Sequence, residues 1–523
     1  MSNKTRISAD GIAPGSADFF DTPLIKPTGF REYDVRWRLT GTDTPELNYT
    51  GLTVLGQAFG TWLFDHLDGF EKDPRVVVGH DFRFYSQNVK NAFALGLMST
   101  GAEVIDVGLL LSPALYFAQH HLDIPAGAMI TASHNENGWT GVKLAQGLSK
   151  TFEPKEVKEY REIVESGRFR TGAGKYDRVE GIRRAYIDDL VSGVKARRPL
   201  KVVVNTGNGT AGLFAPEVFR RAGFEVVEVH TELDWDFPNY NPNPENIKFL
   251  QSIGEAVRQA GADLGVGIDG DGDRLGIVDD RCEEVFSDKV GLLLARHLIP
   301  QARKEGREPR FVIDVKSTYL FEKMVAPLGA EVIWEKTGHS YIKAAVRREK
   351  ATAGFERSGH MFFSRPWGRG YDDGILAGLL FAAMLSEGEK PLSGLLDELP
   401  RSYQTPNMQP HVDDTVKYDV VARLQSQYEE EHRQGHTLAG VAIDRLMTIN
   451  GVRVQFADDS WCLVRASSNT PTLVVLGESF TTRKRLYEMM GEVFDRLKSF
   501  PEVGEFDQMM PDYPGEEDGQ TDR

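Results

Sequence analysis

Short apolar runs alternate with amphipathic stretches along most of the chain. Three segments repeat the order strand, helix, strand, and each closing strand opens with Gly-x-Glu-Val; they span residues 75–107, 201–229 and 310–334. Alternating strands and helices are typical of largely parallel sheets covered by helices. The repetition predicts three related α/β domains in tandem.

The pattern changes after Pro400. Charged, amphipathic stretches predict helices over residues 416–434 and 482–500. Between them lie three short strand candidates, residues 451–456, 461–465 and 472–476. This arrangement is typical of a smaller α+β domain with an antiparallel sheet.

We therefore expect four domains from the 523 residues, in line with ordinary domain sizes. They are residues 1–180, 181–290, 291–402 and 403–523. Both ends of the chain, residues 1–17 and 510–523, are polar and are predicted to be disordered tails.

Composition indicates a soluble globular protein, since 41% of the residues are hydrophobic. No apolar stretch is long enough to span a bilayer, so we expect no membrane partner. The N-terminus has no basic region followed by an apolar core, so no secretory signal is expected. The two cysteines, Cys282 and Cys462, have no metal-ligand spacing and suit a reducing compartment. We expect a cytoplasmic location.

The net charge of −16 argues against nucleic acid as a partner, because phosphate backbones attract basic proteins. A protein this acidic that bound a phosphorylated substrate would have to gather its Arg and Lys side chains locally.

The loop Thr131-Ala132-Ser133-His134-Asn135-Glu136-Asn137-Gly138 follows the apolar run 126–130, which predicts a buried strand. A serine hydroxyl can carry a phosphoryl group covalently, and the adjacent His134 and nearby Lys143 can manage protons and charge. A polar turn that caps the strand would use the same residue types. The loop alone does not separate the two interpretations.

A second turn, Asp269-Gly270-Asp271-Gly272-Asp273-Arg274, follows the apolar run 264–268. Alternate carboxylates in a glycine-rich turn can converge on one hard cation such as Mg²⁺ or Mn²⁺. An EF-hand is a weaker explanation, because Arg274 occupies the position of its glycine and Asp280 that of its final glutamate. An acidic surface turn would leave three carboxylates repelling one another, so the pattern favours a metal site.

Two further motifs are weaker. Glu356 and Ser358 would point to one side of an extended chain and reach sugar hydroxyls, although an ordinary surface loop explains them better when taken alone. The Arg465–Thr470 loop combines one arginine, several hydroxyls and backbone N–H groups, which suits phosphate, while a Ser/Asn turn is the alternative. Residues 30–36 and 337–343 add donors, each weak alone.

Together and in this order, the four motifs resemble the α-D-phosphohexomutase superfamily, most of all its phosphomannomutase/phosphoglucomutase branch. The resemblance covers residues from about 27 to 497. It implies four domains around a central cleft: three related mixed α/β domains and a smaller α+β C-terminal domain.

The resemblance also implies a role for each matching residue. Ser133 would be phosphorylated and, with Asp269, Asp271 and Asp273, would bind Mg²⁺. Arg274 would contact the seryl phosphate, and His134 and Lys143 would serve proton transfer or phosphate handling. The residues that would bind substrate are Tyr33, Arg36, Lys316, His339, Glu356, Ser358, Arg465, Ser467, Ser468, Asn469 and Thr470, the last five as a grip on the phosphate that is not transferred.

Three positions depart from the family pattern. Glu136 stands where proline is common, Trp37 stands where glycine usually follows the N-terminal Tyr-Asp-x-Arg element, and the phosphate loop reads Ser-Ser-Asn-Thr. The last departure leaves the individual roles of Ser468 and Asn469 open, but not the anion site.

The function that the resemblance implies is reversible phosphoryl transfer between C1 and C6 of a hexose phosphate, mannose and/or glucose. It would proceed through phosphoserine and a hexose 1,6-bisphosphate, with one Mg²⁺ per subunit and the bisphosphate as activator. Alternatives are a phosphoglucosamine mutase, a metal-dependent sugar phosphatase and a non-catalytic sugar-phosphate sensor. No residue decides between mannose and glucose, and the oligomeric state is not predicted.

Overall fold

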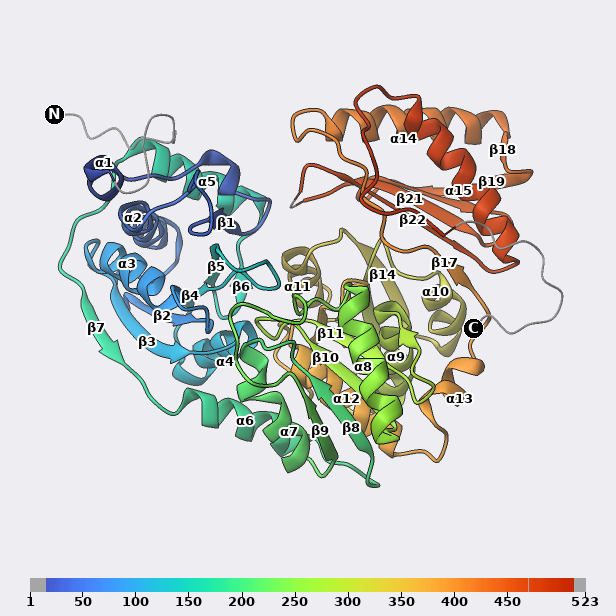
Figure 1. Cartoon of the computed structure of the whole chain (residues 1–523), viewed down its shortest axis with the longest axis horizontal. Helices are drawn as coiled ribbons and strands as arrows, with labels where there is room; N and C mark the ends of the chain where they lie inside the picture. The colour runs from blue at the N-terminus through green and yellow to red at the C-terminus, as the bar shows by residue number, and fades with distance from the viewer. Residues whose placement is uncertain (1–15, 469, 512–523) are drawn as a thin grey trace. The chain divides into compact units, whose positions relative to one another are not determined.

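The computed structural model describes residues 16–468 and 470–511. They form two compact units (Figure 1). The first unit extends to Val312 and resumes over His339–Ser393, and the second contains Ile313–Gly338 and continues from Gly394. Most of both predicted tails, and Asn469, lie outside the described residues.

The first part of unit one is a seven-stranded sheet with helices packed on it. Its elements are α1 (Ala17–Asp21), η1 (Pro27–Gly29), β1 (Val35–Arg38), α2 (Tyr49–His66), β2 (Arg75–His80), α3 (Ser86–Met98), β3 (Glu103–Leu109), α4 (Ser112–Leu122), β4 (Ala126–Ile130), β5 (Trp139–Gln146), β6 (Lys150–Thr151), α5 (Pro154–Ser166), β7 (Lys175–Arg178) and α6 (Ile182–Gly193). The strand order is β1-β5-β4-β2-β3-β7, with β6 on β5. Strands β4, β2, β3 and β7 pair in parallel, while β5 pairs antiparallel with both β4 and β1, so the sheet is mixed.

Helices α2 and α3 lie side by side on this sheet (Figure 1). Two glycines permit the close approach. A Cβ atom on Gly56 would lie 2.0 Å from the carbonyl oxygen of Phe93, and one on Gly96 would lie 2.0 Å from that of Thr53. The resulting core contains buried aromatic side chains such as Phe59 and Phe93.

The second part of unit one repeats the design with five strands. Its elements are β8 (Lys201–Asn205), η2 (Thr210–Leu213), α7 (Ala215–Arg221), β9 (Glu225–Val229), α8 (Ile247–Ala260), β10 (Leu264–Ile268), β11 (Leu275–Val278), β12 (Glu284–Val285) and α9 (Ser287–Lys304). The order is β12-β11-β10-β8-β9. Strands β10, β8 and β9 pair in parallel, whereas β11 pairs antiparallel with both β10 and β12.

The rest of unit one contains α11 (His339–Arg348), β15 (Ala353–Phe355), β16 (Met361–Phe363) and α12 (Gly374–Ser386). Helix α12 is apolar on every side and almost wholly buried. It contacts α7, α9, β10, β11 and β16, and so joins this part of the unit to the five-stranded sheet. The chain passes between the units within β13 (Arg310–Asp314) and α13 (Leu392–Asp397).

Unit two is built on a six-stranded, entirely antiparallel sheet of order β17-β22-β21-β20-β19-β18. Its elements are α10 (Leu320–Met324), η3 (Ala326–Leu328), β14 (Glu331–Glu335), β17 (Tyr403–Gln404), α14 (Lys417–Gln434), β18 (Thr437–Leu438), β19 (Val441–Met447), β20 (Val452–Phe456), β21 (Trp461–Ala466), β22 (Leu473–Ser479) and α15 (Arg483–Lys498). Helices α14 and α15 cover one face (Figure 1).

The second face of this sheet is covered by the segment Ile313–Gly338. Val315 packs with Trp461 and Leu463, which point away from α14 and α15. Arg453 fastens the contact, because its Nη1 donates to the carbonyl oxygen of Val315 at 2.7 Å and its guanidinium lies 3.7 Å from the Trp461 ring centre. The central strands are therefore buried on both faces.

The predicted fold class is confirmed, with strands and helices close to their expected positions. Two expected helices are each divided into a short 3-10 helix and a short α-helix, η2 with α7 and α10 with η3. Pro216 and Pro327 lie at these breaks, and proline lacks the N–H that a continuous helix needs. No helix in the described part of the chain is long and apolar enough to cross a membrane. The four domain boundaries remain predictions.

Candidate active site

Ser133 lies directly after β4, at the carboxyl end of a strand in the middle of the first sheet. Its φ of 53° is in the left-handed region, which non-glycine residues seldom adopt. The side chain is 1% exposed. Its Oγ lies 3.1 Å from Nδ1 of His134 and donates to Oδ2 of Asp269 at 3.3 Å. The serine is thus held in a strained conformation with its hydroxyl between an imidazole and a carboxylate.

Arg83 fixes the backbone of this loop. Its Nη2 donates to the carbonyl oxygens of Ser133 at 3.0 Å and Asn135 at 2.7 Å, while Nη1 is paired with the buried Asp81. Sequence reasoning missed Arg83, because a single arginine after a strand carries no signal that it reaches another loop.

Glycine lets the acidic turn approach the serine. A Cβ atom on Gly270 would lie 2.6 Å from the carbonyl oxygen of Ser133. Any larger residue at this position would push the two loops apart. The alternation of aspartate and glycine therefore has a packing reason beside the chemical one.

The three aspartates of this turn are completely buried, and their ligand oxygens lie within 4.8 Å of one another. Oδ1 of Asp269 accepts from the backbone N–H groups of Gly272, Asp273 and Arg274 at 2.9–3.1 Å, which leaves Oδ2 to face Ser133. Burial and the neighbouring carboxylates raise the pKa of Asp269 well above its ordinary value.

Lys143 is the counter-charge within the cluster. It lies on β5, opposite Met129 of β4, and its Nζ bonds to Oδ2 of Asp271 at 2.7 Å and to Asp273. Although burial opposes it, Lys143 holds the pKa of Asp271 below its usual range. Oδ2 of Asp271 also accepts from Oγ of Ser112 at 2.6 Å, a contact that the sequence did not indicate.

These residues fit a hard divalent cation. One lysine does not balance three carboxylates, and Oδ1 of Asp271 and of Asp273 are buried without a hydrogen-bond partner among the described residues. Buried oxygens of this kind normally have a partner, and a cation would supply one. The donor set is all oxygen, as Mg²⁺ prefers.

His134 is held neutral. Burial lowers its pKa well below the ordinary value, and the cations Arg274 and Arg36 lower it further. Arg36 extends from β1 and donates through Nη1 to Oδ1 of Asn135 at 3.2 Å, so the predicted Tyr-Asp-x-Arg element does reach the serine loop.

Arg274 ends a chain of three neighbouring groups, of which His360 and Asp372 are buried. Its Nε donates to Nε2 of His360 at 3.0 Å, and Nδ1 of His360 lies 3.0 Å from Oδ2 of Asp372. Since Nε2 accepts, a neutral ring carries its proton on Nδ1. Nδ1 and Oδ2 of Asp372 are in close contact, but neither has a hydrogen-bond partner among the described residues. Sequence reasoning quoted His360 at the end of its motif without assigning it a role, and it missed Asp372.

Tyr33 and His339 also come together. Their ring centres lie 4.8 Å apart, edge to face, and His339 begins α11. Burial lowers the pKa of His339 well below the ordinary value, so its imidazole is neutral. One turn later on α11, Nζ of Lys343 lies 2.9 Å from Oδ1 of Asp372.

The side chains of Glu356 and Ser358 are in contact, but the local backbone differs from the extended chain that the sequence predicted. They lie in a tight turn rather than on an extended chain, closed by the N–H of Gly359 donating to the carbonyl oxygen of Glu356 at 3.0 Å. Gly359 permits the turn with its φ of 100°. Ser358 donates to Oε1 of Glu356, and Oε2 is buried with no hydrogen-bond partner in the part of the chain described.

Two departures from the family pattern have simple structural outcomes. The side chain of Glu136 is 69% exposed and lies 3.6 Å from Nη1 of Arg38, so it faces solvent and a cation. Trp37 is completely buried and donates from Nε1 to the carbonyl oxygen of Lys26 at 2.7 Å. Neither residue brings charge to the serine.

The predicted phosphate loop lies in unit two, after β21. Nε of Arg465 donates to Oδ1 of Asn450 at 2.7 Å and Nη2 donates to Oγ of Ser468 at 3.0 Å. Oγ of Ser467 and Oγ1 of Thr470 lie 2.8 Å apart. The side chains of this loop therefore bond largely to one another. Asn469 lies outside the described residues.

Lys417, which sequence reasoning missed, supports this loop. Its Nζ donates to the carbonyl oxygens of Ser467 at 2.6 Å and Thr470 at 3.1 Å. Lys316 is also part of unit two, where it is buried with its Nζ 3.9 Å from Oδ2 of Asp314.

Comparison with known proteins shows which family the chain belongs to. The models for domains I, II and III of phosphoglucomutase/phosphomannomutase match residues 27–171, 184–282 and 286–403. The chain is 32% identical to a phosphomannomutase/phosphoglucomutase of Pseudomonas syringae, over 91% of this chain and 96% of that protein. It is 34% identical to a phosphoglucomutase of Neisseria gonorrhoeae, over 86% and 93%.

A solved structure agrees. The crystal structure of a phosphoglucomutase/phosphomannomutase family protein from Burkholderia thailandensis superimposes with a TM-score of 0.79 at 29% identity, covering 91% of this chain and 98% of that one.

Proposed function

Because the chain belongs to the phosphoglucomutase/phosphomannomutase family, we propose that it interconverts hexose 1- and 6-phosphates through a phosphorylated Ser133. One observation carries the proposal. Ser133 is buried at a strained turn, with its Oγ beside the neutral imidazole of His134 and the carboxylate of Asp269. This environment suits a hydroxyl that holds and passes on a phosphoryl group.

The residues of the site account for each bond and each proton in the proposed phosphoryl transfer. The free hydroxyl oxygen of the bound sugar phosphate attacks the phosphorus on Ser133, the bond from phosphorus to Oγ breaks, and a hexose 1,6-bisphosphate forms. His134, neutral and 3.1 Å from Oγ, takes the hydroxyl proton and returns it to the serine oxygen. The bisphosphate then turns end for end, and Ser133 recovers the other phosphoryl group by the reverse steps.

Neutralisation of the charge on the phosphoryl group would supply most of the remaining transition-state stabilisation, as is usual in phosphoryl transfer. Asp269, Asp271 and Asp273, with the seryl phosphate, would hold Mg²⁺, which neutralises developing charge on the phosphoryl oxygens when bound. Arg274 would bind the seryl phosphate, and we propose that Asp372 positions it through His360.

We assign substrate binding to two groups of residues. Arg465, Ser467, Ser468, Asn469 and Thr470 would hold the phosphate that is not being transferred, because the loop offers a guanidinium and several hydroxyls. Tyr33, Arg36, Lys316, His339, Glu356 and Ser358 would contact the sugar and its phosphates. A bisphosphate that escapes before reorientation leaves Ser133 without phosphate, so added hexose 1,6-bisphosphate would act as an activator.

The burial of Ser133 favours transfer over hydrolysis. A sugar phosphatase needs water at the phosphoserine, whereas this serine is 1% exposed. Both cysteines are free thiols, which favours a reducing compartment and the cytoplasm as the location.

A coupled assay tests the function. The enzyme is supplied with Mg²⁺, a hexose 1,6-bisphosphate and, in turn, mannose 1-phosphate, glucose 1-phosphate or glucosamine 1-phosphate, and both 6-phosphate and free phosphate are measured. We expect 6-phosphate from mannose, glucose or both, with little free phosphate. Stoichiometric free phosphate would establish a phosphatase instead, and turnover of the glucosamine substrate alone would establish the aminosugar mutase.

A further inference from the structure

A basic cavity of about 330 Å³ opens in unit one, outside the candidate active site. Its lining comes from the end of α4, the turn after α9, the end of α11 and the loop after β16. Six of its nine lining residues are basic, namely His120, Arg307, Arg347, Lys350, Arg365 and Arg369, and no acidic residue lines it in the described part of the chain. Such a concentration is unexpected in a protein with a net charge of −16.

Arg307 presents unused donors. Its guanidinium lies 5.3 Å from the ring centre of Trp367, whose Nε1 donates to Oε1 of Gln301 at 3.0 Å and so fixes the indole. Nε and Nη2 of Arg307 are buried without a hydrogen-bond partner among the described residues. Buried N–H donors normally have an acceptor, so this site lacks one.

The basic side chains of the cavity repel one another electrostatically. Burial, followed by the charges of Arg369, Arg347 and Arg365, lowers the pKa of His120 to about 4. Of these, Arg369 has a strong carboxylate partner, Asp189, at 2.5 Å. The remaining repulsion would be relieved by an anion in the cavity.

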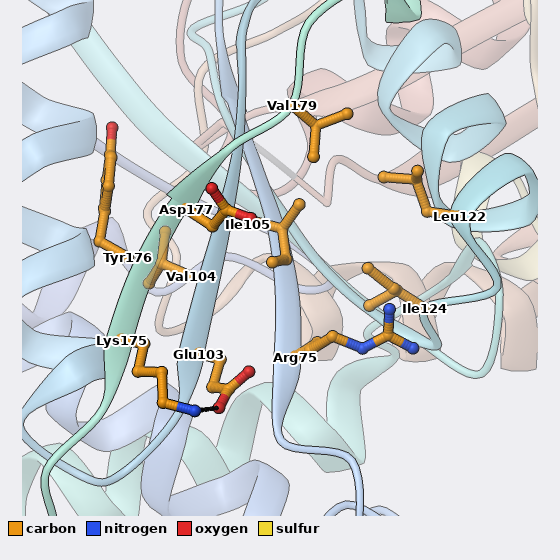
Figure 2. Close-up of a pocket in the computed structure, with 10 residues that line it drawn as sticks. All are labelled: Arg75, Glu103, Val104, Ile105, Leu122, Ile124, Lys175, Tyr176, Asp177 and Val179. Atoms are coloured by element: carbon orange, nitrogen blue, oxygen red, sulfur yellow. Dashed lines mark hydrogen bonds and ion pairs between the residues drawn. The ribbon is translucent and has the colours of Figure 1, made fainter.

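A second cavity shows the more usual arrangement (Figure 2). It measures about 450 Å³ and lies beside β3 and β7. There Nζ of Lys175 is paired with Glu103 at 2.8 Å, as the dashed line in Figure 2 marks, and Arg75 is paired with Asp73 at 2.6 Å. Both of these cations therefore have a carboxylate partner, unlike Arg307 of the basic cavity.

We propose that the basic cavity is a second binding site, for a small anion that carries two or more phosphate groups. Its volume lies at the small end of the range for small-molecule sites, about 300–1,000 Å³. Arginine guanidinium groups bind phosphate oxygens in pairs, and the four arginines offer more donors than a single phosphate accepts. Arg347 lies one turn beyond Lys343 on α11, so the site shares a helix with the phosphoryl-transfer centre.

Calorimetric titration with inorganic pyrophosphate tests the proposal. The probe is titrated into the wild type, an Arg307→Gln/Arg347→Gln variant, a Ser133→Ala variant and a Lys304→Gln control. Lys304 is exposed on α9 and does not line the cavity. We expect saturable binding that the double substitution weakens at least about tenfold, and that the other two substitutions leave unchanged.

Three results would overturn the proposal: no saturable binding to the wild type, equal binding by the double variant, or equal weakening in Lys304→Gln, which would show diffuse attraction only. If the double variant fails to fold by circular dichroism, the exposed Arg365→Gln replaces it, with about threefold weakening expected and unchanged affinity contradicting the site. The readout is binding, so a failed mutase assay would leave this test intact.

Discussion

The Ser133 loop and the Arg465–Thr470 loop both follow buried strands and both consist of small polar residues, yet they are held differently. Groups distant in sequence fix the serine loop: Arg83 binds its carbonyl oxygens and Asp269 accepts from its hydroxyl. The backbone of the second loop is also held from a distance, by Lys417, but its hydroxyls bond to neighbours within the loop: Ser468 to Arg465, and Ser467 to Thr470.

This difference matches two tasks. A reaction centre gains from donors and charges that are fixed before reaction, because nothing then has to reorganise in the transition state. A loop that binds and releases phosphate gains from hydroxyls that bond to one another when the loop is empty. Each hydroxyl can then bond to a phosphate oxygen instead, and no buried partner is left unsatisfied. Substitutions in the first loop should therefore lower kcat, and those in the second should raise KM.

The largest expected effect is that of Ser133→Ala. It removes the phosphoryl carrier, so kcat should fall by at least about 10⁴-fold in the coupled assay. Ser467→Ala provides a matched control in the other loop, and its kcat should change little. A Ser133→Ala variant with turnover near that of the wild type would contradict the proposed centre.

We expect the second-largest loss of activity from Asp271→Asn. It removes one cation ligand and the partner of Lys143, so kcat should fall about 10²- to 10³-fold, and raising the Mg²⁺ concentration should recover only part of the loss. The measurement is kcat as a function of Mg²⁺ concentration. An unchanged rate and an unchanged Mg²⁺ dependence would remove the metal assignment.

Arg465→Gln tests whether the Arg465–Thr470 loop binds phosphate. Loss of a charge-assisted contact with phosphate costs about 2–3 kcal/mol, so kcat/KM should fall roughly 30- to 160-fold, mostly through KM. Steady-state kinetics with the 1-phosphate substrate would check it. If kcat fell instead with KM unchanged, the two loops would not divide their tasks as we propose.

The smallest effect is expected for Ser468→Ala. Arg465 keeps its contact with Asn450, so KM should rise only about threefold, in keeping with one neutral hydrogen bond. A rise as large as that of Arg465→Gln would show that Ser468 itself is the main phosphate ligand.

Much of the candidate site could be predicted from short stretches of the sequence. Ser133, Asp269 and Arg465 each follow an apolar run, and the ends of buried strands are where loops can bring such residues together. The matching residues of the Tyr33–Arg36 element could also be named from the family pattern.

What the sequence did not indicate depends on tertiary placement. Arg83, Ser112, Asp372 and Lys417 are ordinary polar residues until the fold brings them against a loop from elsewhere in the chain. The segment Ile313–Gly338 lies in the predicted third domain and within the range that the domain III model matches. It also packs on the C-terminal sheet, where it contacts Arg453 and Trp461. Local periodicity cannot report such a contact.

The central claim is that Ser133 carries the phosphoryl group and delivers it to sugar. The direct measurement is the mass of the Ser133 peptide after incubation with hexose 1,6-bisphosphate, followed by addition of unlabelled hexose 1-phosphate to enzyme charged with labelled phosphate. We expect one phosphoryl group on Ser133, which then appears in the sugar bisphosphate. An unmodified Ser133 peptide, or label released as inorganic phosphate, would contradict the account.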